Sequence, residues 1–288
     1  MEREQKMKIL VTGANGYLGQ GVVKQLIDDG MEVIATDFKD TFIDKRANIK
    51  CCNIFSLEDP YEFFEKPDVL LHMAWRDGFI HNSLNHINDL PNHMNFIRQM
   101  VESGVKKITI MGSMHEVGFY EGSINENTIC RPMSYYGIGK DAMRNSAFLI
   151  AKENNIVVQW LRGFYIVGNS MHGCSIFSKI TEAAQKGIEE FPFTLGQNQF
   201  DFIDYDTFCL QVASTVEQSE INGIINICNG NPEKLADRVE RFINENNYNI
   251  KLKYGAFPDR PYDSKAVWGD AGKINEIMKN RNKCYFNN

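Results

Sequence analysis

A glycine-rich turn between an apolar strand and an amphipathic helix constrains this chain more than any other feature. Residues 8–12 predict a buried strand, and residues 17–29 predict a helix with apolar side chains at four-residue steps. Gly13, Gly16 and Gly19 join the two with the spacing G-x-x-G-x-x-G. Such glycines allow a tight turn, close approach of a diphosphate to the backbone, and close packing of helix on strand. Because the start of a helix attracts anions, the turn predicts a dinucleotide-binding α/β fold.

Strands and helices alternate along the first 168 residues. Further strands are expected at 32–36, 49–53, 69–73, 107–111 and 156–161, with helices at 90–103 and 135–154. This alternation predicts a Rossmann-type, doubly wound parallel sheet.

The pattern is less regular after Gly168. We expect helices at 176–185, at 206–216 and from Asn231-Pro232 to 243, and strands at 200–205 and 224–227. The sequence therefore predicts a dinucleotide-binding domain over 1–168. A smaller α/β substrate-binding lobe is expected over 169–288, and the chain can cross between the two.

The composition of the chain argues against several classes of binding partner. The 288-residue chain has a net charge of −6, which gives no electrostatic reason to bind nucleic acid or anionic lipid. No apolar run approaches the length of a membrane span, and the first residues do not resemble a signal peptide. The seven cysteines include no C-x-x-C pair, which is typical of reduced thiols, so we expect a cytoplasmic protein.

An acidic residue ends the second strand. Asp37 lies roughly 20 residues after the glycine turn, where a carboxylate can accept hydrogen bonds from an adenosine ribose. Its charge would repel a 2′-phosphate, so NAD(H) is the favoured cofactor. Lys39, two residues further on, keeps NADP(H) possible.

Three side chains suggest proton-transfer chemistry. Tyr136 and Lys140 form a Y-x-x-x-K motif on one face of the helix predicted over 135–154. A nearby ammonium can lower the pKa of the phenol, which can then exchange a proton with a substrate oxygen. Ser113 follows the fifth strand, at the sheet edge where ligands bind in such folds. We therefore predict Ser113, Tyr136 and Lys140 as catalytic residues.

With these motifs the chain resembles the extended short-chain dehydrogenases/reductases of the NAD-dependent epimerase/dehydratase family. Residues 71–74, 132–140, 161–168 and 201–203 also carry the resemblance. It implies substrate contacts at Arg76, Ser113, His115 and Arg260. It also implies cofactor contacts at a larger set of residues: Gly13, Asn15, Gly16, Tyr17, Leu18, Gly19, Asp37, Asn53, Ile54, Met73, Ala74, Trp75, Tyr136 and Lys140.

Several positions depart from the family pattern. Asn53 stands where an aspartate often contacts adenine, Gly112 replaces a frequent serine, and Phe200 replaces a frequent arginine. His81, His86 and His93 do not share one helical face and no cysteine pair joins them, so we expect no metal site.

Residues 72–79 and 112–118 resemble the subgroup of dTDP-4-dehydro-6-deoxyglucose reductases, which form dTDP-fucose. This resemblance implies a 4-ketoreductase acting on a nucleotide-diphosphate sugar, and the family resemblance implies a homodimer. A UDP-hexose 4-epimerase that keeps NAD bound is the alternative. A non-catalytic dinucleotide sensor is a third possibility, because fold alone does not decide function.

Overall fold

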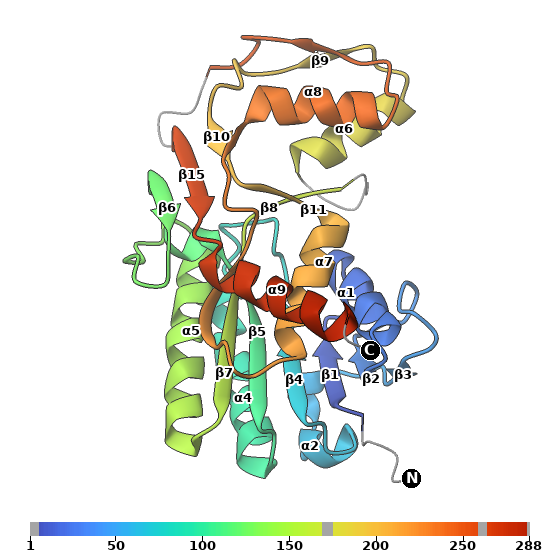
Figure 1. The fold of residues 1–288 in the computed structure, drawn as a ribbon, viewed down its shortest axis with the longest axis vertical. Helices are drawn as coiled ribbons and strands as arrows, with labels where there is room; N and C mark the ends of the chain where they lie inside the picture. Colours follow the sequence, from blue (N-terminus) through green and yellow to red (C-terminus); the bar gives the residue numbers. More distant parts are fainter. Residues whose placement is uncertain (1–5, 169–174, 259–263, 287–288) are drawn as a thin grey trace.

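The computed structural model describes residues 6–168, 175–258 and 264–286. It contains a large sheet with helices on both faces and a smaller lobe, drawn above that sheet in Figure 1.

The large sheet has seven strands in the order β12-β7-β5-β4-β1-β2-β3, and every neighbouring pair is parallel. This arrangement confirms the predicted Rossmann-type fold. The order reverses between β1 and β4, and in such sheets ligands bind beyond the carboxyl ends of the strands at this reversal. The strands are β1 Lys8–Thr12, β2 Glu32–Thr36, β3 Asn48–Ile49, β4 Val69–His72, β5 Lys107–Ser113, β7 Val157–Gly163 and β12 Gly223–Ile227.

Alternating side chains of the central strands fill two separate cores. Ile9 and Val11 of β1 pack into the core that contains side chains of α1 (Tyr17–Asp28), α7 (Tyr205–Val216) and α9 (Gly272–Phe286). Leu10, between them, packs into the core beneath α4 (Leu90–Ser103) and α5 (Tyr135–Asn154). This period of two explains why the strands read as continuous apolar runs, as expected of a sheet buried on both faces.

The remaining elements are short or belong to the smaller lobe. In that lobe α6 and α8 pack together, and β9 pairs with β14 (Figure 1). These elements are η1 Ile54–Ser56, α2 Pro60–Phe63, α3 Asn85–Asn88, η2 Met114–Glu116, β6 Gly122–Ile124, β8 Tyr165–Val167, α6 Ile176–Gln185, β9 Glu190–Pro192, β10 Gln199–Phe200, β11 Phe202–Asp204, β13 Glu233–Lys234, α8 Leu235–Glu245, β14 Lys251–Lys253 and β15 Ala266–Gly269.

Segments beyond residue 168 return to the large sheet. β12 forms its edge, α7 packs on α1, and α9 packs on α7 and β12. The division at Gly168 stays a prediction, with at least these three later elements crossing back.

Three local expectations were wrong. The strand expected over 49–53 is only Asn48–Ile49, and a 3-10 turn begins at Ile54. The helix expected from Asn231-Pro232 begins at Leu235, because Glu233–Lys234 pairs as an antiparallel strand with β10. The single strand expected over 200–205 is two short strands, β10 and β11, separated at Asp201. The Asp201 carboxylate accepts backbone hydrogen bonds from Asn229, Gly230 and Gly269, so it joins loops instead of facing an open site.

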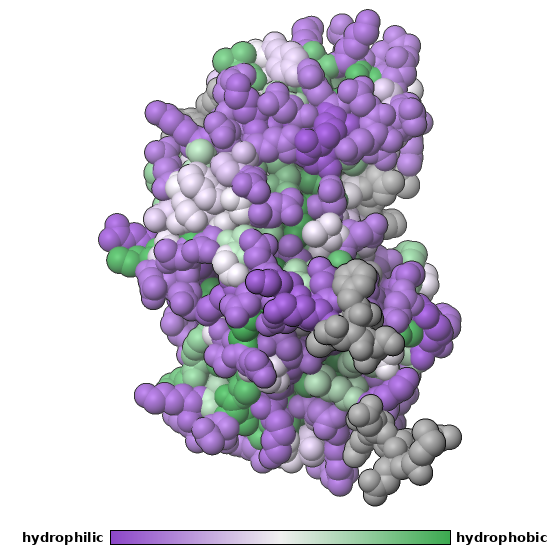
Figure 2. Space-filling model, in the orientation of Figure 1, coloured by the Kyte–Doolittle hydropathy of each residue, from purple (hydrophilic) through white to green (hydrophobic). Residues whose placement is uncertain are grey.

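None of the helices in the described part of the chain is long and apolar enough to cross a membrane. The face shown in Figure 2 is mostly hydrophilic, with smaller hydrophobic areas between the polar side chains.

A partly buried ionic cluster attaches the last helix to the sheet layer. Arg281 of α9 donates to Asp29, at the end of α1, at 2.5 Å and to Glu217, at the end of α7, at 3.1 Å. The two carboxyl groups also hydrogen-bond each other. Desolvation and the neighbouring Asp29 raise the pKa of Glu217 above its ordinary value, because both disfavour a second negative charge.

We predict that this cluster makes stability depend on pH. Glu217 binds a proton more tightly in the folded state, so the free energy of unfolding should fall as pH rises from about 4.5 into the neutral range. In Glu217→Gln this component should vanish, which urea unfolding at several pH values would detect. The exposed Glu102→Gln variant is the control and should keep the wild-type dependence. Parallel pH profiles for wild type and Glu217→Gln would contradict the assignment.

Candidate active site

The glycine turn leaves backbone exposed where a diphosphate would lie. Gly13 has φ of +70°, and a Cβ there would come within 2.7 Å of the Ala74 nitrogen. A Cβ on Gly19 would come within 2.1 Å of the Gly13 oxygen. Gly16 is the N-cap of α1 and contributes no side-chain cap, so Tyr17 and Leu18 begin the helix behind a bare backbone. This cradle fits a dinucleotide diphosphate.

The other predicted cofactor residues follow the same edge of the sheet. Asp37 ends next to the turn, where its carboxylate accepts from the Asn15 nitrogen at 3.1 Å. Asn53 caps η1 by accepting from the Phe55 nitrogen, and Ile54 is buried behind it. The backbone nitrogens of Met73 and Ala74 each donate to Thr12 Oγ1 at 3.2 Å, which fixes the end of β4 against β1. These residues therefore lie along the carboxyl edge of the sheet, and their contacts with a cofactor stay predictions.

Ser113 and Tyr136 meet at this edge from two different elements. Ser113 ends β5, Tyr136 lies in the first turn of α5, and the serine hydroxyl hydrogen-bonds the phenol. The start of α5 is fixed by Ser134, whose side chain caps the Gly137 nitrogen at 3.1 Å, and by the Tyr136 nitrogen, which donates to the His81 oxygen at 2.9 Å. A hydroxyl pair held in this way can bind and protonate a carbonyl oxygen.

The ionisation of Tyr136 differs from the expectation. Desolvation raises the pKa of Tyr136 to about 12, although the hydrogen bond from Ser113 acts in the opposite direction. The groups that shift this pKa are Ser113 and Glu116, besides burial. The Nζ of Lys140 donates to the Met111 oxygen at 2.7 Å and lies 5.9 Å from the tyrosine ring centre. In this structure Tyr136 is therefore a protonated acid at neutral pH. The expected lowering of its pKa by Lys140 is not found.

Lys140 is buried, and burial lowers its pKa to about 7 despite the opposing influence of Glu116. The face of Trp75 covers the ammonium, with 3.9 Å between Nζ and the ring centre. The ammonium thus lies between the indole and the tyrosine ring, where a ribose hydroxyl could accept a hydrogen bond from it.

Two histidines flank the tyrosine ring. His81 stacks on Tyr136 with 5.1 Å between ring centres and 10° between the planes, and His115 lies 4.4 Å from His81. Desolvation lowers the pKa of both, that of His115 to about 4, so both rings are neutral at neutral pH. His115 was predicted as a substrate contact. His81 was considered only for a metal, because no sequence pattern reveals stacking between separate loops.

Comparison with known proteins assigns the family. The profile of the NAD dependent epimerase/dehydratase family matches residues 9–228. The chain belongs to this family.

Relatives and solved structures agree with this assignment. A dTDP-6-deoxy-L-talose 4-dehydrogenase (NAD(+)) of Aggregatibacter actinomycetemcomitans is 40% identical over 270 residues, covering 91% of this chain and 99% of the relative. The structure of a UDP-glucose 4-epimerase from Thermotoga maritima with UDP-glucose has a TM-score of 0.78 at 22% identity, covering 94% and 92% of the two chains. A UDP-glucuronic acid 4-epimerase from Bacillus cereus, in complex with UDP-glucuronic acid and NAD, has a TM-score of 0.77 at 19% identity, covering 95% and 93%. The predicted family and the enzyme class, an NAD-dependent oxidoreductase, are confirmed.

Other predicted residues of this family member have local partners. Arg76 forms a two-pronged ion pair with Asp89 at 2.8 and 2.9 Å, with its side chain more than half exposed. Arg260 lies outside the described residues. In the described part of the chain no group of three or more His, Cys, Asp or Glu side chains could hold a metal ion. His86 and His93 instead take part in hydrogen bonds with Trp75 and His72.

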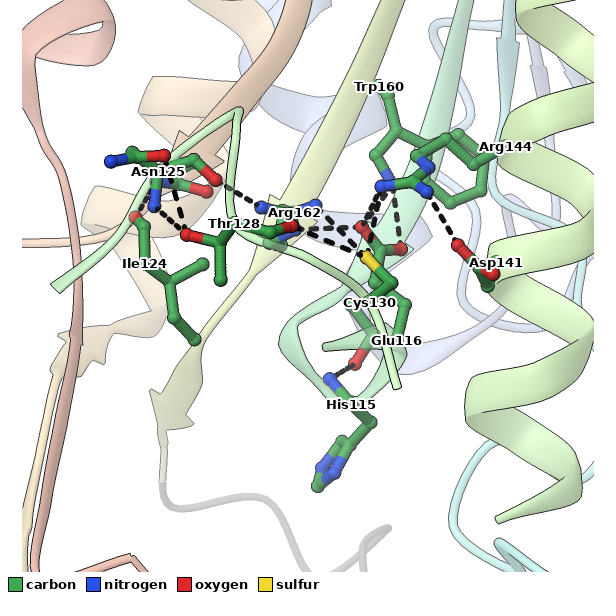
Figure 3. A network of polar contacts seen from close by, with 12 residues as sticks. His115, Glu116, Ile124, Asn125, Thr128, Cys130, Asp141, Arg144, Trp160 and Arg162 are labelled. Carbon is green, nitrogen blue, oxygen red and sulfur yellow. Dashed lines mark hydrogen bonds and ion pairs between the residues drawn. The ribbon is translucent and has the colours of Figure 1, made fainter. Parts of the chain in front are cut away.

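A buried carboxylate next to the site, that of Glu116, is not among the residues predicted from the sequence. Figure 3 shows Glu116 surrounded by donors: Trp160 Nε1 at 2.8 Å, Arg162 Nε at 2.7 Å and, further off, Arg144 at 3.8 Å. Glu116 ends η2, the turn that directly follows Ser113, so this cluster anchors that turn.

Gly112 is the position in the sequence that could have indicated this cluster. A Cβ at that position would come within 2.2 Å of Trp160 Nε1, so the glycine that replaces the frequent family serine makes room for the indole. The departure at 112 and the carboxylate at 116 therefore belong to one packing arrangement.

We predict a large stability loss from Glu116→Gln. The change removes the counter-charge of the buried Arg162 and should cost about 3–5 kcal/mol in urea unfolding. Glu126→Gln, which breaks an exposed ion pair with Lys273, is the matched control and should cost less than about 1 kcal/mol. Equal losses in the two variants would show that Glu116 has no special structural role.

Proposed function

We propose that the protein is a nucleotide-sugar 4-ketoreductase that interconverts a dTDP-4-keto-6-deoxyhexose and its 4-hydroxy sugar with NAD(H). The observation that carries the proposal is the hydrogen-bonded Ser113–Tyr136 pair beside the buried cation Lys140. The sequence and structure support this set at the carboxyl edge of a dinucleotide-binding sheet, in a family that depends on NAD.

Each residue has a distinct role in the proposed reaction. When bound, the nicotinamide supplies the hydride to the sugar C4 carbon, or accepts it in reverse. Tyr136 gives its proton to the oxygen at C4, and Ser113 orients that oxygen by hydrogen bonding. Lys140 holds the nicotinamide ribose and, once a hydroxyl lies between it and the phenol, favours the tyrosinate left after proton transfer. The glycine cradle and Asp37 would hold the diphosphate and the adenosine ribose.

The protonation state of Tyr136 in the free protein suits the reduction of a keto sugar better than the oxidation of an alcohol. A phenol with a pKa near 12 carries its proton at neutral pH, as a proton donor must. Oxidation of an alcohol needs the tyrosinate form of Tyr136. That reaction therefore depends more on groups of the cofactor and substrate that lower the pKa of Tyr136.

The relative with 40% identity points to the sugar class. Its name describes oxidation at C4 of dTDP-6-deoxy-L-talose, and reduction of a 4-keto sugar is the same reaction in reverse. We therefore extend the proposed product from dTDP-fucose to dTDP-6-deoxy-L-talose as the first compound to test.

Turnover with added cofactor separates reductase from epimerase. The protein should oxidise NADH in proportion to a dTDP-4-keto-6-deoxyhexose, and should reduce NAD⁺ when given dTDP-6-deoxy-L-talose. A reductase releases its cofactor in each cycle, whereas an epimerase retains it and consumes none. Interconversion of UDP-hexoses by protein that purifies with NAD, without use of added cofactor, would support the epimerase and overturn the proposal.

Tyr136→Phe separates an enzyme from a sensor. Loss of the proton donor should lower kcat by about 10²- to 10⁴-fold, while thermal stability and NAD affinity change little. The neighbouring Tyr135 is partly exposed at the first position of the same helix, so Tyr135→Phe is the matched control and should keep wild-type turnover. Full activity in Tyr136→Phe would remove the tyrosine from the mechanism.

The proposal includes a cytoplasmic homodimer. Ile138 and Leu149 on α5 are 42% and 56% exposed, and pairing of two α5 helices would cover them. Light scattering of the purified protein would measure the oligomeric state.

A further inference from the structure

Trp75 lies just beyond the carboxyl end of β4 and packs against the buried Lys140. Its ring covers the buried Lys140 ammonium at 3.9 Å, and the edge of Tyr136 meets it with 6.4 Å between ring centres. A desolvated ammonium over an indole face is strongly stabilised by the ring's quadrupole. The Met111 carbonyl, at 2.7 Å from Nζ, also stabilises the charge.

The indole is fixed in this position by two histidines. Its Nε1 donates to His86 Nδ1 at 3.0 Å, and His86 Nε2 in turn bonds the Ile80 oxygen at 3.0 Å. The ring also stacks on His93, with 4.8 Å between centres and 21° between planes. His93 is itself hydrogen-bonded to His72 at 2.9 Å. The tryptophan is thus held both by its N–H group and by its face.

The Y-x-x-x-K helix is built to accept this ring. Gly139 directly precedes Lys140, and a Cβ there would come within 3.2 Å of Trp75 Cζ2 and within 2.8 Å of the His86 oxygen. A glycine inside a helix is costly relative to alanine, so the close approach of the indole gives it a structural reason.

From this geometry we infer that Trp75 is a positioning residue for Lys140, whose ring holds the ammonium charged and in place before the dinucleotide binds. The inference rests on the proposed role of Lys140 in holding the nicotinamide ribose. It goes beyond that role because it assigns to Trp75 the positioning of Lys140. Trp75 was predicted as a cofactor contact, and that contact stays a prediction beside the role inferred for its side chain.

Several charged and titratable groups lie around Lys140 and bear on the measurement of its titration. Tyr136 and the carboxylate of Glu116 are the acidic groups that act on it or lie beside it, and His72 and His93 are the neighbouring imidazoles. Desolvation keeps both imidazoles neutral far below neutral pH, and the phenol keeps its proton far above it. His86 also lies against the indole, so a titration near pH 7 is assigned to Lys140 by its loss in Lys140→Met.

Fluorination of the indole at position 75 tests the inference without changing its shape. Each fluorine weakens the negative potential of the ring face, so the titration midpoint of Lys140 should fall stepwise from tryptophan to tetrafluorotryptophan, by about one pH unit across the series. The midpoint is measured in the free protein from the ¹³C shift of the lysine Cε, with the signal identified by its loss in Lys140→Met. A midpoint that does not change along the series would overturn the inference.

Two substitutions give a second, independent comparison. Trp75→Leu should lower the midpoint and weaken NADH binding about tenfold above pH 7, with a smaller loss at lower pH, whereas Trp75→Phe should restore part of both. Phe55→Leu removes an aromatic ring that contacts the far part of the same stack, 4.8 Å from His93, and should leave the midpoint unchanged. Equal effects of Trp75→Leu and Phe55→Leu would mean that the tryptophan only packs.

The midpoint needs neither substrate nor turnover, so the two proposals fail separately. A fluorine-dependent midpoint in a protein that reduces no nucleotide keto sugar would leave Trp75 in its role and remove the proposed reaction. Normal reduction of the keto sugar, with a Lys140 midpoint that fluorination does not change, would keep the proposed reaction and remove the role of Trp75.

Discussion

Burial of a single positive charge organises the site. Lys140 is taken out of water at the carboxyl edge of the sheet, and its ammonium is compensated by the Met111 carbonyl, the Trp75 ring and the more distant Glu116. An uncompensated charge in such a place would lose its proton. The surroundings of Lys140 keep this cation available for a ribose hydroxyl. They include the neutral histidines, the glycine that precedes the lysine, and the protonated Tyr136.

A second buried charge, of opposite sign, fixes the other half of the site. Glu116 is fully buried and is satisfied by Trp160 and Arg162, which belong to β7. Glu116 ends the turn that follows Ser113, so the ion pair fixes this turn to β7. Within the turn, the His115 nitrogen donates to the serine hydroxyl oxygen at 3.3 Å. The substrate oxygen would then meet two hydroxyl groups attached to separate rigid elements, β5 and α5, which is a favourable basis for precise orientation.

The parts that could be predicted from sequence are those that local pattern determines. The glycine turn, the alternation of strands and helices, and the Y-x-x-x-K face gave the fold class and the three residues proposed as catalytic, because each depends on spacing within one element or one turn. Contacts between distant segments could not be read in this way. The stack of Trp75 on His93, the covering of Tyr136 by His81 and the Glu116 cluster join residues whose types carry no information about their partners. Gly112 was a visible departure from the family pattern, and Gly139 lies inside the predicted Y-x-x-x-K motif. Only the indoles placed against these two glycines explain why no side chain fits there. The strand at Glu233–Lys234 was missed because pairing with β10 outweighed the local preference for a helix after Asn231-Pro232.

Transfer of isotope tests the central claim, that this site passes a proton from Tyr136 while the cofactor delivers hydride to the sugar. The measurement uses NADH with deuterium at the transferable position of the nicotinamide and a dTDP-4-keto-6-deoxyhexose, with the product examined by NMR. The account predicts one deuterium at C4 of the sugar for each NAD⁺ formed. A product without deuterium at C4, or with deuterium at another carbon, would contradict it.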